Sequence, residues 1–418
     1  MRTTLPAAEF VSGLRWNDVP EPVRLRTEAL VRDLAAVTCA GAATPTARIA
    51  ARYAAEQHGG SQASLLYDGA RVSSTGAAWA NGVLANALDF DDGHRLVKGH
   101  PGAIVIPAAL AVAETVGAPR EEVLAAITVG YEVAVRAGIA LHARDADYHG
   151  SGSWGAIGAA AAGARLLRLD PAQVGHALGL AEYHAPMAPV MRSVADPAMT
   201  KDACGWGALA GTAAALLAAA GFTATDCLAV DALADPAAQL GAHWYVGDMY
   251  IKAFPCCRWS HPAIAAALTL RAAHGIDPGT IRRVTVRTFT AAAELSRRPP
   301  TTTEEAQYSL LWPVAAALVS ADFGVEQVLP SAFDDQLTHD LAGRIDVQID
   351  PALEAEFPAV RRSAVTVETS DGGRSHTSEL TEAPGEPDDA NWGHIIAAKF
   401  ARYAGGLSPE SPLARLLR

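Results

Sequence analysis

The chain has 418 residues, of which half are apolar and only 19% are charged, so it can build a large core and lacks the composition of a disordered protein. Its length exceeds what one hydrophobic core usually supports and favours two domains. The formal net charge of −12 argues against nucleic acid or an anionic membrane as the main partner. An aromatic content of 6% together with 36 Gly indicates helices that pack through small side chains.

Helices dominate the expected structure up to about residue 240. Apolar residues recur there at spacings of three and four, which is the helical period. Asp170 before Pro171, and Asp235 before Pro236, are typical helix starts with a capping residue ahead of proline. The clearest predicted helices are 107–116, 120–137, 155–167, 171–183 and 201–220.

One uncharged stretch, Cys204 to Phe222, imitates a membrane span. Its apolar content is chiefly Ala and Gly, which gain little from lipid, and no second segment of this kind is evident. It is therefore interpreted as a buried core helix. The N-terminal ten residues have no apolar signal-peptide core, so secretion is not expected.

The cysteines favour a reducing cytoplasm. They are odd in number and include no CxxC metal spacing and no disulfide-rich region. The five are Cys39, Cys204, Cys227, Cys256 and Cys257.

The pattern changes after residue 262. Segments 282–289, 345–349 and 365–369 alternate apolar and polar residues and predict half-buried antiparallel strands. Helices are expected between them at 303–321 and 324–329. We therefore predict a mainly α protein in which residues 257–384 form a smaller α+β domain. Residues 1–256 and 385–418 form a large all-helical domain, to which the helical tail 390–418 returns.

The densest polar cluster is LDFDDGHRLVKGHPG at residues 88–102. It can be interpreted as a functional site at a helix mouth, or as a solvated loop whose Asp residues cap the next helix. Asp and His also ligate divalent cations. No metal site is predicted, because Arg95 and Lys98 would compete with a cation for the carboxylates.

A second cluster, DYHGSGSWG at 147–155, opens an Ala-rich helix. The backbone N–H groups of such a helix start attract anions, including carboxylates. A capped helix start without ligand is the alternative. No strand precedes the cluster, so a nucleotide-binding glycine loop is not favoured.

Two further clusters carry basic residues. Arg192 and Lys201 stand ahead of the long uncharged helix, where a buried lysine needs an anion or another partner. The segment KAFPCCRWSHP at 252–262 contains adjacent cysteines. We interpret these as packing residues rather than a redox pair, and His261 as the chemically interesting member.

Taken together, the four clusters resemble the MmgE/PrpD family, the 2-methylcitrate dehydratase-like proteins. The resemblance covers most of the chain and implies an all-helical domain with a smaller α+β domain, usually in a homodimer. The matching stretches are ALDFDDGH…HPGAIVIPAALAVAE (87–114), YHGSGSWGAIGAAAAGARLL (148–167), MTKDACGWGALAG (199–211) and KAFPCCRWSHPAIAAAL (252–268).

The resemblance implies an enzyme that acts on small di- and tricarboxylates without metal, flavin or nicotinamide. Family activities include dehydration of 2-methylcitrate, decarboxylation of cis-aconitate and epimerisation of iminodisuccinate. Each forms a carbanion or enolate next to a carboxylate, which requires acid–base groups and nearby cations. A lyase of the dehydratase type is expected first, with an epimerase or a decarboxylase as alternatives. A non-catalytic binding protein is the rival outside the enzymes.

The same resemblance implies the site residues. Gly93 stands where dehydratase and decarboxylase members have a threonine, so a hydroxyl contact to the substrate or leaving group is expected to be lost. The expected catalytic residues are Asp89, His100, Lys201 and His261, and the expected substrate-binding residues are Gly93, His94, Tyr148, His149, Arg192 and Arg258.

A mechanism follows as a hypothesis. Lys201, Arg192 and the helix start at 150–154 bind the substrate carboxylates. His100 or His261 removes the proton next to a carboxylate, because histidine, with an ordinary pKa of about 6.5, exists in both forms near neutral pH.

Overall fold

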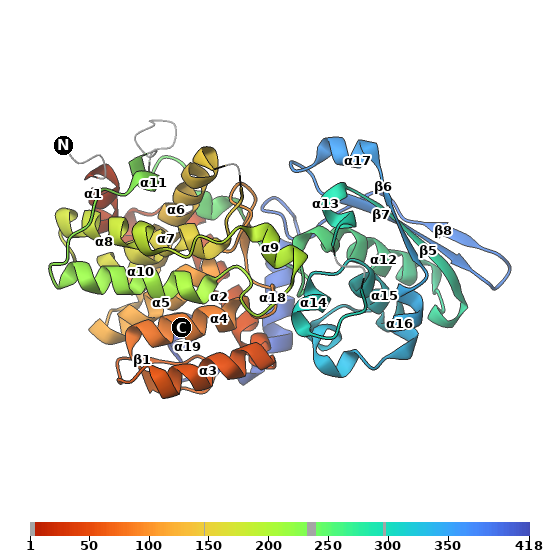
Figure 1. The fold of residues 1–418 in the computed structure, drawn as a ribbon, viewed down its shortest axis with the longest axis horizontal. Coiled ribbons are helices and arrows are strands. Elements are labelled where there is room, and N and C mark those ends of the chain that lie inside the picture. Colours follow the sequence, from red (N-terminus) through yellow and green to blue (C-terminus); the bar gives the residue numbers. More distant parts are fainter. Residues whose placement is uncertain (1–4, 146, 232–239, 296–297) are drawn as a thin grey trace.

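The computed structural model describes residues 5–145, 147–231, 240–295 and 298–418. Two lobes are visible in Figure 1. One contains the helices of the N-terminal half and the C-terminal end, and the other contains the main sheet with its own helices. The protein is mainly helical, as predicted. The exact domain boundaries near 257 and 384 remain a prediction.

The helical lobe is built around helices rich in Ala and Gly. Helix α10 packs against α4, α7 and α8. A Cβ atom added at Gly211 of α10 would lie 2.3 Å from the carbonyl oxygen of Ala156 in α7, so only glycine allows this approach. The helices of this lobe are α1 (Leu5–Gly13), α2 (Glu21–Gly41), α3 (Pro45–Gln57), α4 (Ser74–Asn86), α5 (Gly102–Val116), α6 (Arg120–Arg144), α7 (Ser151–Leu166), α8 (Pro171–His184), α9 (Val190–Ala195), α10 (Cys204–Ala219), α11 (Leu228–Asp231), α18 (Trp392–Tyr403) and α19 (Pro412–Leu416).

Helix boundaries differ from the predictions where tertiary contacts act. Helix α5 begins five residues before Pro107, because the Asp92 carboxylate caps the Gly102 N–H at 3.0 Å. Helix α10 begins at Cys204 rather than Lys201, since Lys201 and Ala203 have positive φ angles. The helix start predicted at Asp170 is present, and Asp170 forms a capping box with Gln173. The Asp235-Pro236 cap lies outside the described residues.

The segment that imitated a membrane span is a buried helix, as expected, but another helix passes the test better. Helix α10 has 16 residues, whereas α6 has 25 and is long and apolar enough to cross a membrane. The expectation of a single span-like segment was therefore wrong. In α6, 94% of the most apolar window is buried inside the protein. A core helix passes the same test of length and composition.

The second lobe contains the main sheet. Its strand order is β6-β5-β7-β8, and β9 pairs with β7. Strand β7 pairs antiparallel with β5, but β6 runs parallel to β5, so the prediction of antiparallel strands was wrong for β6. The elements are α12 (His261–His274), β5 (Ile281–Thr288), α13 (Thr290–Ala293), α14 (Thr303–Gln307), α15 (Leu311–Ser320), α16 (Gln336–Ala342), β6 (Ile345–Ile349), α17 (Pro351–Glu356), β7 (Arg362–Thr369), β8 (Ser375–Thr377) and β9 (Thr381–Glu382).

The helix predicted at 303–321 is interrupted. Helix α14 ends at Gln307 and α15 starts at Leu311, so residues 308–310 form a bend between them. The segment predicted as a helix at 324–329 contains only a short 3-10 turn, Val325–Val328. The bend brings Gln307 and Tyr308 to the boundary between the lobes, where Gln307 donates to the Ala87 carbonyl.

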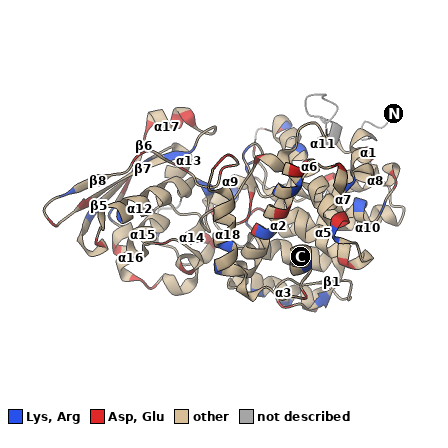
Figure 2. Ribbon diagram, turned by 180° about the vertical axis from the view of Figure 1, so that it is seen from behind, with Lys and Arg blue, Asp and Glu red and all other residues tan. Residues whose placement is uncertain are grey.

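The lobes share apolar packing at their boundary. Leu88 and Phe90 are fully or nearly fully buried and belong to the core of the second lobe, although they follow α4 of the first. Helix α18 packs against α2, and Lys399 of α18 pairs with Asp33 at 2.7 Å. Figure 2 shows acidic and basic residues interspersed along the ribbons of both lobes.

Candidate active site

A cavity of about 230 Å³ lies between the lobes. That is smaller than the several hundred Å³ of typical drug-sized ligand pockets, so it suits a small molecule. Charged side chains in its wall are mixed with aromatic ones. The wall is formed by Asp89, Lys98, His100, Tyr148, Val190, Met191, Val194, Asp202, Tyr250, Lys252, Cys257, Arg258, Trp259, Ala291, Tyr308, Phe357 and Arg361.

Asp89 is held in the cavity wall by its neighbours in the chain. The buried side chains of Leu88 and Phe90 pack in the core of the second lobe. Asp89 itself has a positive φ of 50°. Lys252 fixes this conformation, since its Nζ donates to the Asp89 carbonyl at 2.9 Å and lies 2.8 Å from the carboxylate Oδ1.

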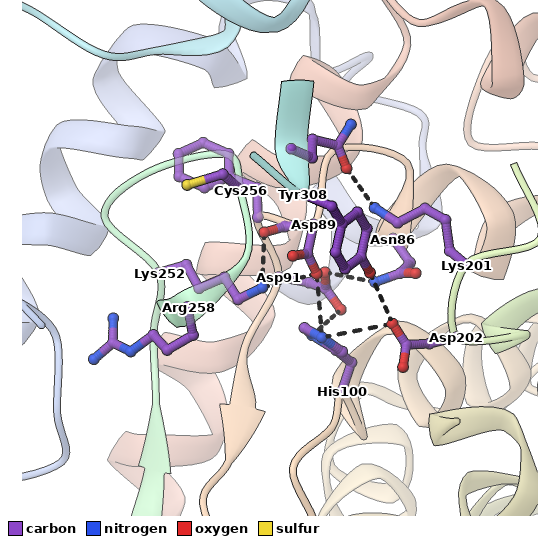
Figure 3. A network of polar contacts seen from close by, with 12 residues as sticks. Asn86, Asp89, Asp91, His100, Lys201, Asp202, Lys252, Cys256, Arg258 and Tyr308 are labelled. Carbon is purple, nitrogen blue, oxygen red and sulfur yellow. Dashed lines mark hydrogen bonds and ion pairs between the residues drawn. The ribbon is translucent and has the colours of Figure 1, made fainter. Parts of the chain in front are cut away.

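His100 is enclosed by carboxylates (Figure 3). Its Nε2 lies 3.2 Å from Asp89 Oδ1, and its Nδ1 lies 3.2 Å from Asp91 Oδ2 and 2.9 Å from the Asp92 carbonyl. Ser151 Oγ accepts from the His100 backbone N–H at 2.9 Å. Burial would lower the pKa of His100, but Asp91 and Asp89 raise it to about 9. His100 is therefore an imidazolium at neutral pH.

The pKa of Asp89 is set by the cations around it, His100 included. Burial would raise its pKa, but Lys252, Lys201 and His100 together hold it well below the ordinary value. The Lys252 ammonium is also stabilised, because Asp89 raises its pKa against the opposing effect of burial. Asp89, His100 and Lys252 thus form a buried network of fixed charges at the cavity wall.

Asp202 faces His100 across the same end of the cavity. Its Oδ2 lies 4.0 Å from His100 Nε2 and accepts a hydrogen bond from the Tyr308 hydroxyl at 3.5 Å. Burial raises the pKa of Asp202, partly opposed by His100. The network therefore contains an imidazolium with a raised pKa and a carboxylate with a raised pKa side by side.

Lys201 lies at the edge of this network (Figure 3). Its Nζ donates to Gln307 Oε1 at 2.6 Å, and Gln307 in turn donates to the Ala87 carbonyl at 3.1 Å. Lys201 lines a neighbouring hollow rather than the cavity itself. Its charge reaches the site through Asp89, whose pKa it helps to lower.

The solvated-loop interpretation of residues 88–102 is wrong in part. Asp89, Asp91 and Asp92 are all nearly fully buried. One element of that interpretation is present, because Asp92 caps helix α5 at Gly102. Burial raises the pKa of Asp92 to about 7, although Tyr131 donates a hydrogen bond to it.

Three side chains in this network are close enough to bind a metal ion. The charged groups around them disfavour such binding. Asp89, His100 and Asp202 offer ligand atoms that all lie within 4.8 Å of one another. However, Lys252 Nζ already neutralises Asp89 at 2.8 Å. In addition, His100 as an imidazolium has no free lone pair for a metal.

Tyr148 and Arg258, both predicted to bind substrate, also line the cavity. The Lys98 ammonium lies 3.5 Å from the centre of the Tyr148 ring. Arg258 pairs with Glu386 at 3.0 Å and donates to the carbonyl oxygens of Ile251 and Ala383. Arg258 therefore ties together the two segments that connect the lobes.

His261 does not line the cavity. It is fully buried behind Arg258, whose Nη1 lies 3.4 Å from His261 Nδ1, and His261 Nε2 is 3.2 Å from the Cys256 carbonyl. Burial, together with Arg258 and Lys252, lowers the pKa of His261 well below its ordinary value. His261 is thus neutral, and its two ring nitrogens are occupied by protein groups.

Four other predicted substrate-binding residues lie outside the cavity wall. His94 is buried against Tyr245, and burial lowers its pKa to about 4. His149 is buried with its Nε2 3.6 Å from Asp145. Arg192 is exposed, although its helix α9 contributes Val190 and Met191 to the wall. Gly93 lies behind Tyr250, with which it pairs between β3 (Gly93–His94) and β4 (Met249–Tyr250).

The helix start at 150–154 does not offer its N–H groups to a ligand as expected. Gly150 N–H donates to the Ala188 carbonyl at 2.8 Å, and Gly152 N–H donates to the Asp202 carbonyl at 2.9 Å. Ser153 N–H donates to the Gly150 carbonyl at 3.0 Å. The glycine-rich cluster therefore positions His100, through Ser151, and Asp202, rather than an anion.

Sequence reasoning assigned no site role to most of the wall, including several of its polar residues. Asp202 adjoins Lys201, and Lys252 opens the fourth cluster, so both lie within the motif stretches but were assigned no role. Tyr250 could have been noticed just ahead of that cluster. Tyr308 and Arg361 carried no signal. Tyr308 lies in the bend at residues 308–310 and Arg361 directly precedes β7, and only the fold brings these two segments to the cavity.

Comparisons with known proteins find two family models that together match most of the chain. Family models described as the MmgE/PrpD N-terminal domain and the MmgE/PrpD C-terminal domain match residues 7–231 and 254–416. The chain is 24% identical over 450 residues to a cis-aconitate decarboxylase of Aspergillus terreus, across 98% of this chain and 90% of that protein. It is 30% identical over 197 residues to a cis-aconitate decarboxylase of Homo sapiens, across 43% of this chain and 40% of that protein.

Proposed function

The chain belongs to the MmgE/PrpD family, and on that premise we propose that it is a cofactor-independent lyase acting on a small di- or tricarboxylate. The observation that carries the proposal is the pairing of His100 and Asp202 in one small cavity. His100 has a pKa raised to about 9 and Asp202 has a raised pKa, and their side chains are 4.0 Å apart. Neighbouring groups of this kind supply an acid and a base.

In a dehydration, the Asp202 carboxylate removes the proton next to a substrate carboxylate. The electron pair of that C–H bond forms the carbon–carbon double bond. The bond to the leaving hydroxyl breaks, and His100 protonates the departing oxygen to give water. Lys252 and Lys98 stabilise the negative charge that develops on the carboxylate.

Decarboxylation is the second candidate, favoured by the names of the relatives. The bond to one carboxyl carbon breaks, carbon dioxide leaves, and the remaining electron pair forms a carbanion next to a second carboxylate. His100 then donates its proton to that carbon. This reaction needs an acid but no base, which suits an imidazolium held by two carboxylates.

Epimerisation is less well supported by the site. Inverting a carbon centre requires one group to remove a proton from one face and another to deliver a proton to the opposite face. His100, Asp202 and Tyr308 form one contiguous cluster. His261, the second histidine expected to serve as an acid or base, is outside the cavity wall.

Proton NMR in deuterium oxide tests the proposal with cis-aconitate, 2-methylcitrate and a panel of related acids. A growing vinyl signal supports dehydration, and release of carbon dioxide supports decarboxylation. Deuterium exchange or loss of optical activity without either would replace the lyase by an epimerase. Binding of an acid with no exchange, elimination or carbon dioxide would contradict an enzymatic role.

We further propose that the protein works as a homodimer in the cytoplasm, as the resemblance and the cysteine content suggest. Trp206 is 53% exposed and Met199 is 44% exposed, and apolar side chains of this kind are enriched at subunit interfaces. Light scattering after size-exclusion chromatography measures the mass directly.

A further inference from the structure

The cavity wall contains a buried arginine, Arg361, that the proposed mechanism does not use. We propose that Arg361 and Tyr250 form a subsite for a substrate carboxylate that does not react, and that this subsite selects acids with at least two carboxylates. The inference rests on the proposed function, which assigns the reacting end of the substrate to His100 and Asp202. The contacts of Arg361 and Tyr250 do not depend on which reaction takes place.

Arg361 is a buried cation with unmet hydrogen-bonding capacity. It precedes β7, lines the cavity and is only 4% exposed. Its Nε and Nη1 atoms are buried and have no hydrogen-bond partner among the described residues. A buried guanidinium is costly unless an anion pairs with it. Because Arg361 faces a cavity, the missing partner is expected to be a ligand.

The neighbouring arginines, unlike Arg361, have anionic partners within the protein. Arg258, on the same wall, pairs with Glu386 at 3.0 Å and binds backbone carbonyls. Arg362, the next residue in the chain, pairs with Glu356 at 3.3 Å. The need for an anionic partner is therefore a property of Arg361 and not of the basic segment as a whole.

The loop that carries Arg361 is fixed to the motif cluster of the first lobe. Arg95 donates to the Ala359 carbonyl at 2.7 Å and pairs with Glu386 at 2.7 Å. Phe357 of the same loop lines the cavity. The guanidinium is thus held in place before a ligand binds, which reduces the entropic cost of binding.

Tyr250 lines the same cavity close to Arg361. Its ring lies 4.7 Å from the guanidinium carbon of Arg258 and 5.9 Å from that of Arg361. Burial raises the pKa of Tyr250 despite the nearby cations, so the phenol stays protonated and can donate a hydrogen bond. A guanidinium and a phenol together are suitable donors for a carboxylate.

Gly93 is what makes this position of Tyr250 possible. A Cβ atom at residue 93 would lie 2.3 Å from the Tyr250 hydroxyl oxygen, which is far inside contact distance. A threonine at 93 and a tyrosine hydroxyl at this place exclude each other. The hydroxyl expected to be lost at position 93 is therefore replaced by one that reaches the same space from position 250.

Binding of two probe acids tests the subsite without requiring turnover. Succinate has two carboxylates and butyrate has one on a chain of equal length, and isothermal titration calorimetry measures both dissociation constants. Hydrogen bonds to charged groups are strong enough that the wild type should prefer succinate by about 10- to 100-fold. Arg361→Met should remove most of that preference and leave butyrate binding within about twofold.

Three further variants sharpen the result. Arg361→Lys should retain part of the preference, because it keeps the charge but not the planar donor group. Tyr250→Phe should weaken succinate binding by about 10- to 100-fold, as expected for the loss of one hydrogen bond to a charged group. Arg362→Met, the matched control in the adjacent residue, should bind both acids as the wild type does.

Thermal unfolding separates a binding role from a structural one. Without ligand, Arg361→Met should unfold at the same or a higher temperature, since it removes an unpaired buried charge. The rise in unfolding temperature caused by succinate should be smaller than in the wild type. A lower unfolding temperature together with unchanged succinate preference would indicate that Arg361 is structural.

Several outcomes would overturn the subsite. These are equal wild-type affinity for succinate and butyrate, no wild-type binding of succinate, an unchanged preference in Arg361→Met, or inorganic phosphate binding as tightly as succinate. The proposed function fails separately. If Arg361→Met loses the preference but the wild type turns over no acid, the subsite stands and the lyase does not.

Discussion

Two segments meet at the boundary between the lobes, and the two histidines expected to act in catalysis, His100 and His261, lie one in each. In the acidic segment 89–100, His100 lies between Asp89 and Asp91, which raise its pKa to about 9. In the basic segment 251–261, His261 is fully buried next to Arg258, and its pKa is lowered well below the ordinary value. The same side chain is therefore a cation at position 100 and neutral at position 261.

The contrast shows that residue type does not assign a catalytic role. A histidine becomes an acid when carboxylates stabilise its charged form, and it becomes inert when burial and cations disfavour that form. Access matters as well, since His100 lines the cavity and His261 does not. The difference in charge and access between His100 and His261 should appear in the activity, pH profile and stability of variants at these positions.

Replacing the acid should abolish most of the activity. His100→Gln removes the transferable proton, so turnover should fall by about 10²- to 10⁴-fold, the usual contribution of a general acid or base. Steady-state kinetics with the acid identified by NMR provides the measurement. Turnover within tenfold of the wild type would show that another group protonates the substrate.

Removing one carboxylate should move the pH profile. Asp91→Asn lowers the pKa of His100, because Asp91 is the main group that raises it. His100 acts as an acid, so activity is lost above its pKa, and the alkaline limb of the turnover profile should move to lower pH. Above that limb the rate falls about tenfold per pH unit. An unshifted alkaline limb would assign it to a different group.

Stability should also report the charge of His100. Its folded pKa of about 9 lies above the ordinary value of about 6.5, so its contribution is fully present below pH 6.5. The contribution is lost as the pH rises through 9 and amounts to a few kcal/mol, at roughly 1.4 kcal/mol per pKa unit. Urea unfolding across this range should therefore show a steeper alkaline loss in the wild type than in His100→Gln.

The smallest effect on turnover is expected in the basic segment. In His261→Gln, the amide can still accept from Arg258 and donate to the Cys256 carbonyl, so turnover should fall by less than about tenfold.

The contribution of His261 to the free energy of unfolding should depend on pH with the opposite sign to that of His100. A lowered folded pKa makes neutral His261 stabilising above pH 6.5, and that stability is lost as the pH falls. The variant should accordingly be less sensitive to acid than the wild type.

A loss of 10²-fold or more in His261→Gln, with a normal unfolding temperature, would contradict the comparison. It would return His261 to a direct role in proton transfer. The double variant of His100 and His261 then distinguishes coupled from independent roles, since independent effects add on a free-energy scale.

The local patterns predicted much of the fold. Helical periodicity indicated α6, α7 and α8, and alternation indicated β5 and β7. The patterns failed where a contact distant in sequence decides the conformation. Asp92 extends α5 ahead of Pro107, and the bend at residues 308–310 divides a continuous helical pattern. The parallel pairing of β6 carries no signature of its own in a short alternating segment.

As with the fold, the sequence predicted part of the candidate site. Asp89, His100, Tyr148 and Arg258 line the cavity as expected of site residues, whereas His94, His149 and Arg192 lie elsewhere. Density of polar residues along the chain located the region. It could not say which side chains turn inward, because that depends on packing such as the burial of Leu88 and Phe90 on either side of Asp89.

The sequence by itself determined the mainly helical architecture, the family and the segment that carries His100, the proposed acid. Composition, periodicity and short motifs are local properties, and they persist in the chain before it folds. Only the tertiary structure decided which histidine is charged. It also brought Asp202, Tyr308 and Arg361 into one cavity. Those features depend on dielectric environment and on distances between residues far apart in the chain, both of which exist only when the two lobes are packed together.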